Sequence, residues 1–139
     1  SCMRAHVVTF LWRAAGQPEP VTTVNPFVDV KPTDFYYKAV LWAVEMGVTN
    51  GLDATHFGPF AYCNRAQVVT FLHRAMGKPS YTTAVSPFTD VTDPSAFYYA
   101  PVLWAVENGI TNGMGAGLFG IGSICNRAQV VTFLYRAFA

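Results

Sequence analysis

The sequence predicts an all-α fold made of tandem helix-loop-helix repeats, and repeated strings with helical spacing carry this prediction. One string contains Arg-Ala, Val-Val-Thr-Phe-Leu and a closing Arg-Ala, and it returns three times, beginning at Cys2, Cys63 and Cys125. A second string, rich in aromatic residues, returns twice at 35–51 and 97–113. Apolar residues recur in both strings at spacings of three and four, as on one face of a helix. The chain therefore holds two whole repeats and the second half of an earlier one.

The aromatic string predicts the first helix of each whole repeat, over about 33–46 and 95–108. Gly47 and Gly109 follow these segments at the position where helices commonly end. Pro101 falls in the first turns of the later copy, where few intrahelical donors exist yet. We therefore expect that helix to start late or to kink at the proline.

The second helix of each whole repeat carries its own start signal. Asn64 and Asn126 suit the N-cap, and Gln67 and Gln129 follow three residues later, as in a capping box. The arginine after each cap then occupies the first helical position. These signals place the start of both helices within a residue.

The half-repeat at the start of the chain lacks the capping signals. Met3 stands in place of the asparagine and His6 in place of the glutamine, so we expect its first turn to be weaker by about 1 kcal/mol. We predict one domain over residues 1–139, with the half-repeat at 1–17 and the whole repeats at 25–79 and 86–139.

Composition narrows the classes of function. The chain is 52% hydrophobic, 15% aromatic and 12% charged, which excludes disorder and leaves apolar surface for a partner. A net charge of +1 without a basic run argues against nucleic acid as a ligand. No stretch is apolar for the roughly 18 residues that cross a bilayer, so we expect no membrane insertion, and we expect any export signal upstream.

The order of these elements resembles the S-layer homology (SLH) repeat over essentially the whole chain. An aromatic-Asp-Val segment at 26–30 and 87–91 comes first, followed by an aromatic-led helix ending in Glu-x-Gly, a loop from Gly to Phe, and a helix opening with Arg-Ala-Gln. The resemblance implies a pseudo-threefold bundle with one central helix from each repeat and the other helices as prongs. It also implies attachment to a Gram-positive cell wall through a secondary cell-wall polysaccharide held in grooves between repeats.

The resemblance implies that the arginines opening the second helices, Arg4, Arg65 and Arg127, bind this polysaccharide. A guanidinium offers a planar fork of donors to a carboxylate such as a pyruvyl ketal, and helix N-terminal amides add positive potential. The family typically has Thr-Arg-Ala-Glu here, whereas this chain has glutamine or histidine in place of the acid. The simpler alternative is that these arginines pair with Asp29 or Asp90 or are merely solvated.

The predicted polysaccharide-binding set contains further residues. For the aspartates and tryptophans among them, a structural role is the stronger alternative to contact with the sugar. Asp29 and Asp90 suit a turn or cap first and the orientation of an arginine or sugar second. Trp42 and Trp104 lie at core spacing, so we favour packing over a sugar-stacking platform. The remaining candidates are the turn residues Asn50, Gly51, Asn112 and Gly113.

The three cysteines occupy equivalent positions before each second helix. Their spacing brings Cys2, Cys63 and Cys125 together only if the pseudo-threefold axis passes close by, and we expect a position on a prong instead. We interpret each as a small buried hydrophobe, with a disulfide or thiolate metal site as a minor alternative. The histidines show no ligand spacing, and we expect no metal and no cofactor.

Three functions remain in order of preference. The first is non-catalytic anchoring of an exported protein at the cell wall or S-layer, with the polysaccharide as partner. The second is a protein-interaction or self-assembly module on the same scaffold, and the open end left by the half-repeat makes a homo-oligomer possible. An enzyme is the weakest, because the repeated glutamates Glu45 and Glu107 have no second carboxylate at the spacing of a glycosidase pair.

Overall fold

The computed structural model describes residues 1–138, and its regular elements over that range are all helices, which confirms the predicted all-α class. Residues 1–138 form isolated β-bridges, such as those of Met3 with Tyr62 and Asn64 with Ile124, but no β-strand. No helix in this part of the chain is long and apolar enough to cross a bilayer. The helices are α1 (Arg4–Ala14), α2 (Tyr37–Glu45), α3 (Arg65–Ala75), α4 (Tyr99–Glu107) and α5 (Arg127–Phe138).

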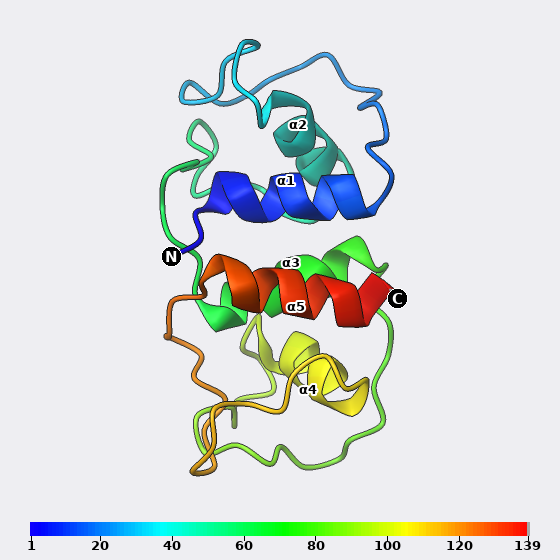
Figure 1. Ribbon diagram of the computed structural model, residues 1–139, viewed down its shortest axis with the longest axis vertical. Coiled ribbons are helices and arrows are strands. Elements are labelled where there is room, and N and C mark those ends of the chain that lie inside the picture. The colour runs from blue at the N-terminus through cyan, green and yellow to red at the C-terminus, as the bar shows by residue number, and fades with distance from the viewer. Residues whose placement is uncertain (139) are drawn as a thin grey trace.

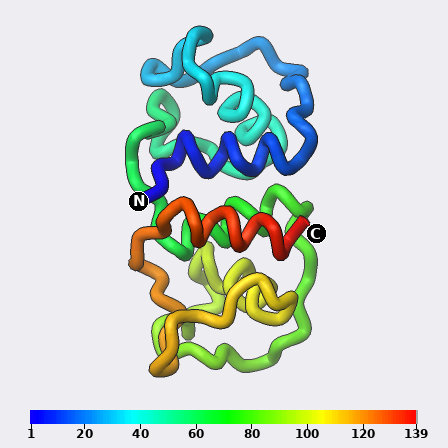
Figure 2. Tube along the Cα trace, in the orientation of Figure 1, coloured from blue at the N-terminus to red at the C-terminus, as the bar shows by residue number. Residues whose placement is uncertain are grey.

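The second helices of the repeats form the centre of the molecule. Helices α1, α3 and α5 contact one another pairwise, while α2 packs on α1 and α4 packs on α3. Figures 1 and 2 show α2 and α4 at opposite ends of the molecule with the three central helices between them. Each outer helix thus covers the central helix of the preceding repeat, which confirms the predicted bundle with prongs.

The predicted caps of the central helices are present. The side-chain oxygen of Asn64 accepts from the Gln67 amide at 2.8 Å, and the Gln67 side chain accepts from the Asn64 amide at 2.9 Å. The same reciprocal pair opens α5 at 2.8 and 3.0 Å. Met3 caps α1 without any side-chain hydrogen bond. The capping signals in the sequence therefore placed these helix starts correctly.

The outer helices begin about one turn later than predicted. Asp34 organises a turn in which its Oδ2 accepts from the Lys31 amide at 2.8 Å and its carbonyl accepts from the Tyr37 amide at 3.1 Å. This local side-chain bond competes with helix over the residues before Tyr37. Helix α4 begins at Tyr99, two residues before Pro101 and in register with α2, so a delay at the proline was a wrong expectation.

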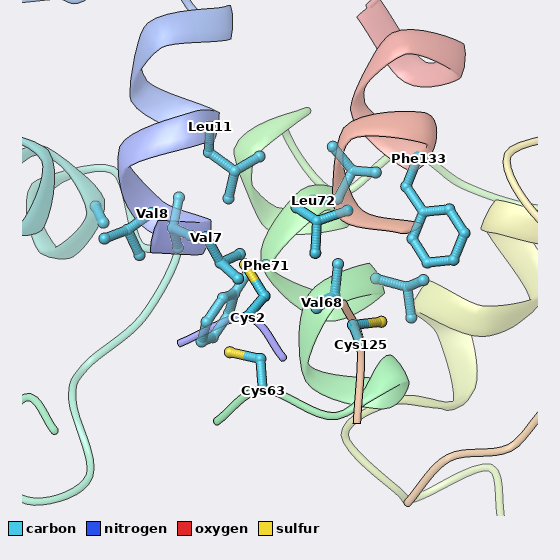
Figure 3. Close-up of a cluster of buried hydrophobic side chains, with 14 of the residues drawn as sticks. Cys2, Val7, Val8, Leu11, Cys63, Val68, Phe71, Leu72, Cys125 and Phe133 are labelled. Atoms are coloured by element: carbon cyan, nitrogen blue, oxygen red, sulfur yellow. The ribbon is translucent and has the colours of Figure 1, made fainter. Parts of the chain in front are cut away.

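The cysteines lie on the pseudo-threefold axis, which corrects the prediction that they stay apart. The Cys2 amide donates to the Cys125 carbonyl at 2.8 Å, Cys63 donates to Cys2 at 2.9 Å, and Cys125 donates to Cys63 at 3.0 Å. The ring closes because the three central helices start side by side at the axis. All three thiols are free and buried, as predicted, and the sulfur atoms of Cys63 and Cys125 point apart in Figure 3. Residues 1–138 contain no group of three side chains placed to hold a metal.

Candidate functional site

Arg65 connects the central helix of one repeat to the loop of the next. Its side chain is 4% exposed, although the residue opens α3. Nε donates to the carbonyl of Phe119 at 2.9 Å, and Nη2 donates to Oγ1 of Thr111 at 3.1 Å. The guanidinium carbon lies 4.8 Å from the centre of the Phe119 ring and 5.5 Å from that of Phe133. The loop therefore fixes the plane of the guanidinium.

Arg4 repeats this arrangement at the other inter-repeat junction. Nε donates to the Phe57 carbonyl at 3.0 Å and Nη2 to Oγ1 of Thr49 at 3.3 Å. The guanidinium lies 4.9 Å from the Phe57 ring and 5.3 Å from the Phe71 ring, and the residue is again 4% exposed. Residues 1–138 thus build two equivalent arginine sites, one at each junction.

The aspartates of the opening segments hold the loops that surround these arginines. Oδ1 of Asp29 accepts from the Phe57 amide and Oδ2 from the Gly58 amide, both at 2.9 Å. Asp90 accepts from the two equivalent amides of the later loop at 2.9 and 2.8 Å. This is the turn role favoured for both residues. Neither aspartate forms a salt bridge with an arginine among the described residues.

Both guanidinium groups are therefore buried cations without an ion-pair partner. Burial lowers the pKa of Arg4 and of Arg65, because the charged form loses hydration. Nη1 of each arginine has no acceptor among residues 1–138. The one fully buried polar side-chain atom without a partner in residues 1–138 is Nδ1 of His6, so neither Nη1 is fully buried. Asp29 and Asp90 stabilise these charges without a direct ion pair, and burial outweighs their effect on the pKa of each arginine. Each site presents one donor edge of a cation that has no salt bridge.

The predicted turn residues shape the same loops. The backbone of Gly51 has φ of +89°, and a Cβ there would lie 2.6 Å from the Phe27 ring. The hydroxyl of Thr49 accepts from the Gly51 amide at 3.1 Å while it also binds Arg4. Gly113 has the same φ and the same bond to its threonine in the later repeat. The remaining turn candidates, Asn50 and Asn112, lie exposed beside these glycines.

Three predicted site residues lie outside the arginine sites. Arg127 is exposed, and its guanidinium lies 5.7 Å from the Phe10 ring without a loop around it. Trp42 and Trp104 are 5% and 4% exposed, which confirms the preferred core role. A buried indole cannot offer its face to a sugar, so we leave both tryptophans out of the candidate site.

Some residues of the site were missed by the sequence reasoning. Thr49 and Thr111 hold the arginines, and the repeated Thr-Asn-Gly was the available signal for both. Phe60 is 67% exposed and follows Pro59, whose carbonyl accepts from the second residue of α1. Its counterpart in the later repeat is Gly122, so this exposed ring has no equivalent beside Arg65.

One cavity of the molecule lies away from these sites. Its volume is about 260 Å³, its walls are largely apolar, and it lies beside α2. No arginine lines it. The lining residues are Thr22, Val24, Pro26, Leu41, Val44 and Glu45.

The fold and the site define a module of tandem helical repeats in which a central helix presents an arginine to the loop of the following repeat. The family profile of the S-layer homology domain matches residues 26–69 and 87–131, more than half of the chain. The chain therefore belongs to the S-layer homology domain family, as the sequence predicted. It is a cell-surface anchoring module, and this family is one of non-catalytic domains.

Two relatives place the module within longer proteins. A cell surface protein of Thermoanaerobacter kivui is 29% identical over 96% of this chain and 18% of its own length. An endoglucanase of Bacillus sp. (strain KSM-635) is 29% identical over 90% of this chain and 13% of its own length. The chain thus spans less than a fifth of either relative. The prediction of a location at the cell surface is confirmed by the family.

Proposed function

We propose that this module anchors its protein by binding an acidic secondary cell-wall polysaccharide at the sites of Arg4 and Arg65. The observation that carries the proposal is the free Nη1 edge of two buried, unpaired guanidinium groups. A carboxylate on the sugar, such as a pyruvyl ketal, accepts from this edge and neutralises the charge. No catalytic step is involved.

Electrostatics favour an anionic ligand over a neutral one. A buried cation without a counter-ion is costly, so a site that stays charged gains most from a ligand that brings the opposite charge. The protein acceptors around Arg65 are a carbonyl and a hydroxyl, which orient the guanidinium, and Asp90 stabilises its charge without forming a salt bridge. Its rigid placement also reduces the entropy lost on binding.

The two sites differ in their aromatic surroundings. Phe60 and Phe35 are exposed, and both contact Tyr36 edge to face. Phe35 has an exposed equivalent in Phe97, whereas Phe60 has none. An exposed ring offers an apolar face to the C–H face of a sugar. Since Gly122 replaces Phe60 at the Arg65 site, we propose that the Arg4 site contributes the greater part of the affinity.

The test is capture of the chain by purified wall glycan with and without its acidic substituent. The variant Arg4→Gln/Arg65→Gln should lose at least about tenfold in affinity, the loss of one charge-assisted bond per site. Arg13→Gln changes the charge at an exposed position of the same repeat string and serves as the control. Arg4→Lys/Arg65→Lys keeps the charge without the fork and covers the case in which the glutamine variant fails to fold. A folded chain that ignores the glycan at low salt would instead favour a protein-interaction module.

A further inference from the structure

Three Asn-Gly pairs occur in the chain, at 50–51, 108–109 and 112–113. Asparagine is chemically labile before glycine, because the glycine amide nitrogen can attack the asparagine side chain and no glycine side chain hinders the approach. The other asparagines precede either a proline, which has no amide proton, or an arginine at a helix start, where their side chains form caps. The structure divides the three Asn-Gly pairs into one protected and two accessible sites.

The side chain of Asn108 and the amide that follows it are both held at the end of α4. Nδ2 of Asn108 donates to the Trp104 carbonyl at 2.9 Å. The Gly109 amide donates to the Val106 carbonyl at 3.1 Å. Attack of the Gly109 nitrogen on the asparagine side chain requires both bonds to open, so the helix end protects this asparagine.

Asn50 and Asn112 lie in loops, and their exposed side chains form no hydrogen bond among residues 1–138. The amide of the following glycine donates to Oγ1 of the preceding threonine, at 3.1 Å in the earlier loop and 3.4 Å in the later one. A bond to a side-chain hydroxyl thus restrains each attacking nitrogen, and the longer bond is the weaker restraint. The asparagine side chain beside it is unrestrained.

We propose that Asn50 and Asn112 deamidate in the folded protein and that this modification loosens the loops that hold Arg4 and Arg65. The glycine nitrogen gives up its proton and attacks Cγ of the asparagine. A C–N bond forms, the C–Nδ2 bond breaks, and the side-chain nitrogen leaves as ammonia with that proton. Water then opens the succinimide ring at either carbonyl, which yields aspartate or isoaspartate. Each event consumes one water molecule and adds one negative charge to the loop.

Isoaspartate at position 50 would break the contact that positions Arg4. The reaction inserts the asparagine Cβ into the main chain ahead of Gly51. A Cβ on Gly51 itself would lie 2.6 Å from the Phe27 ring, so the turn has little room for a longer backbone. The Gly51 amide then loses the Thr49 hydroxyl, which also accepts from Nη2 of Arg4. The same contacts recur in the later loop.

The new carboxylate also changes the electrostatics of the arginine site. It follows directly on the threonine that binds the guanidinium, in a loop that Asp29 or Asp90 already holds through its amides. A further negative charge stabilises the cation and repels an acidic sugar. Weaker anchoring is the consequence, and this step alone rests on the proposed function.

Peptide mapping of aged protein tests the chemistry. The 139-residue chain is kept at mildly alkaline pH, folded or in denaturant, and digested at intervals. Mass spectrometry with chromatographic separation then identifies aspartate and isoaspartate at each site. In denaturant the three Asn-Gly pairs should react at similar rates. In the folded chain Asn50 and Asn112 should react at least about tenfold faster than Asn108, because two hydrogen bonds must open at Asn108.

The matched control is Asn50→Gln/Asn112→Gln, which keeps both amides and the net charge but cannot close the same ring. After equal ageing, the unmodified chain should unfold at a lower temperature than this variant. The aged unmodified chain should also bind acidic wall glycan at least about threefold more weakly than the aged variant, since its new carboxylates repel a like charge.

Two results would overturn the proposal. One is a folded chain in which Asn50 and Asn112 persist while the denatured chain converts, or in which Asn108 reacts as fast as they do. The other is a modified chain with the unfolding temperature of the aged glutamine variant, since the loops would then tolerate the product. Neither measurement involves glycan, so a failure of the proposed function appears separately, as an unaged chain that does not bind.

Discussion

Thr111 accepts a hydrogen bond from Nη2 of Arg65 at 3.1 Å and so joins the loop of one repeat to the central helix of the repeat before it. Both side chains are buried, and the same pair recurs between Thr49 and Arg4. Each threonine also accepts from the amide of the glycine two residues later. One hydroxyl thus fixes both the turn and the arginine that we propose as a ligand.

Replacement of this hydroxyl should weaken the fold and the site together. Thr111→Val keeps the shape but leaves a donor of Arg65 unsatisfied, which should cost about 1.5–3 kcal/mol of unfolding free energy. The measurement is urea denaturation. Thr23→Val, at an exposed threonine without side-chain hydrogen bonds, is the control. Equal midpoints for the two variants would show that the Thr111 bond contributes nothing to stability.

Asp90 should make stability depend on pH in the acid range. Burial acts to raise its pKa, but the amides of Phe119, Gly120 and Ile121 outweigh this and hold the pKa below its ordinary value of about 3.9. A group with a depressed pKa stabilises the fold above its unfolded pKa and loses this contribution as pH falls through its folded pKa. We therefore expect Asp90→Asn to be less stable at pH 7 and to lose less stability below about pH 4.

The comparison for this pH dependence is Glu19→Gln, whose exposed carboxylate pairs with Lys38 at the surface. The unfolding temperature is measured between neutral and acid pH. Its dependence on pH should be the same for Glu19→Gln as for the unmodified chain and should differ for Asp90→Asn. If the stability of the Asp90 variant and that of the unmodified chain changed in parallel with pH, the Asp90 carboxylate would not be holding the loop amides.

Gly113 should tolerate a side chain less well than Gly109 does. At φ of +89°, a Cβ would lie 2.7 Å from the Phe88 ring and 2.9 Å from the Leu118 carbonyl. Gly109 has φ of +71° with nothing within 4 Å of the added Cβ. We expect Gly109→Ala to cost about 1 kcal/mol and Gly113→Ala about 2 kcal/mol or more. The free energy of unfolding of both variants is measured by denaturation. A larger loss for Gly109→Ala than for Gly113→Ala would contradict the prediction.

The three buried cysteine thiols should be unreactive in the folded protein. Burial raises the pKa of Cys63 to about 12 and that of Cys125 to about 11, so almost no thiolate is present at neutral pH. Native protein at pH 7.4 should react with a thiol reagent only at the rate of unfolding, and unfolded protein should react at all three positions. Rapid labelling under native conditions would show that the axis is open to solvent.

The sequence predicted most of the fold because its signals are local. The Asn-x-x-Gln boxes at Asn64 and Asn126 specify helix starts within four residues, and the repeats specify how many helices there are. The start of α2 was placed too early because the turn around Asp34 competes with helical periodicity. Such a short-range bond does not alter the spacing of the apolar residues in the sequence, so that spacing could not reveal the later helix start.

The site was less predictable because its contacts join distant segments. Arg65 meets Phe119 and Thr111, and nothing near Arg65 in the sequence identifies either partner. The family resemblance drew attention to the arginines, but the three Arg-Ala motifs have two different environments in the structure. Only the packing of the outer helices shows why Arg65 is buried and Arg127 is exposed.

The most direct test of the anchoring account follows the arginine side chains themselves. Proton–nitrogen correlation spectra of the Nε groups, recorded during titration with acidic wall glycan, report on each guanidinium separately. The account predicts saturable shifts of the Arg4 and Arg65 signals, none at Arg13, and no response to glycan stripped of its acidic substituent. Glycan binding that leaves the Arg4 and Arg65 signals unmoved would contradict it.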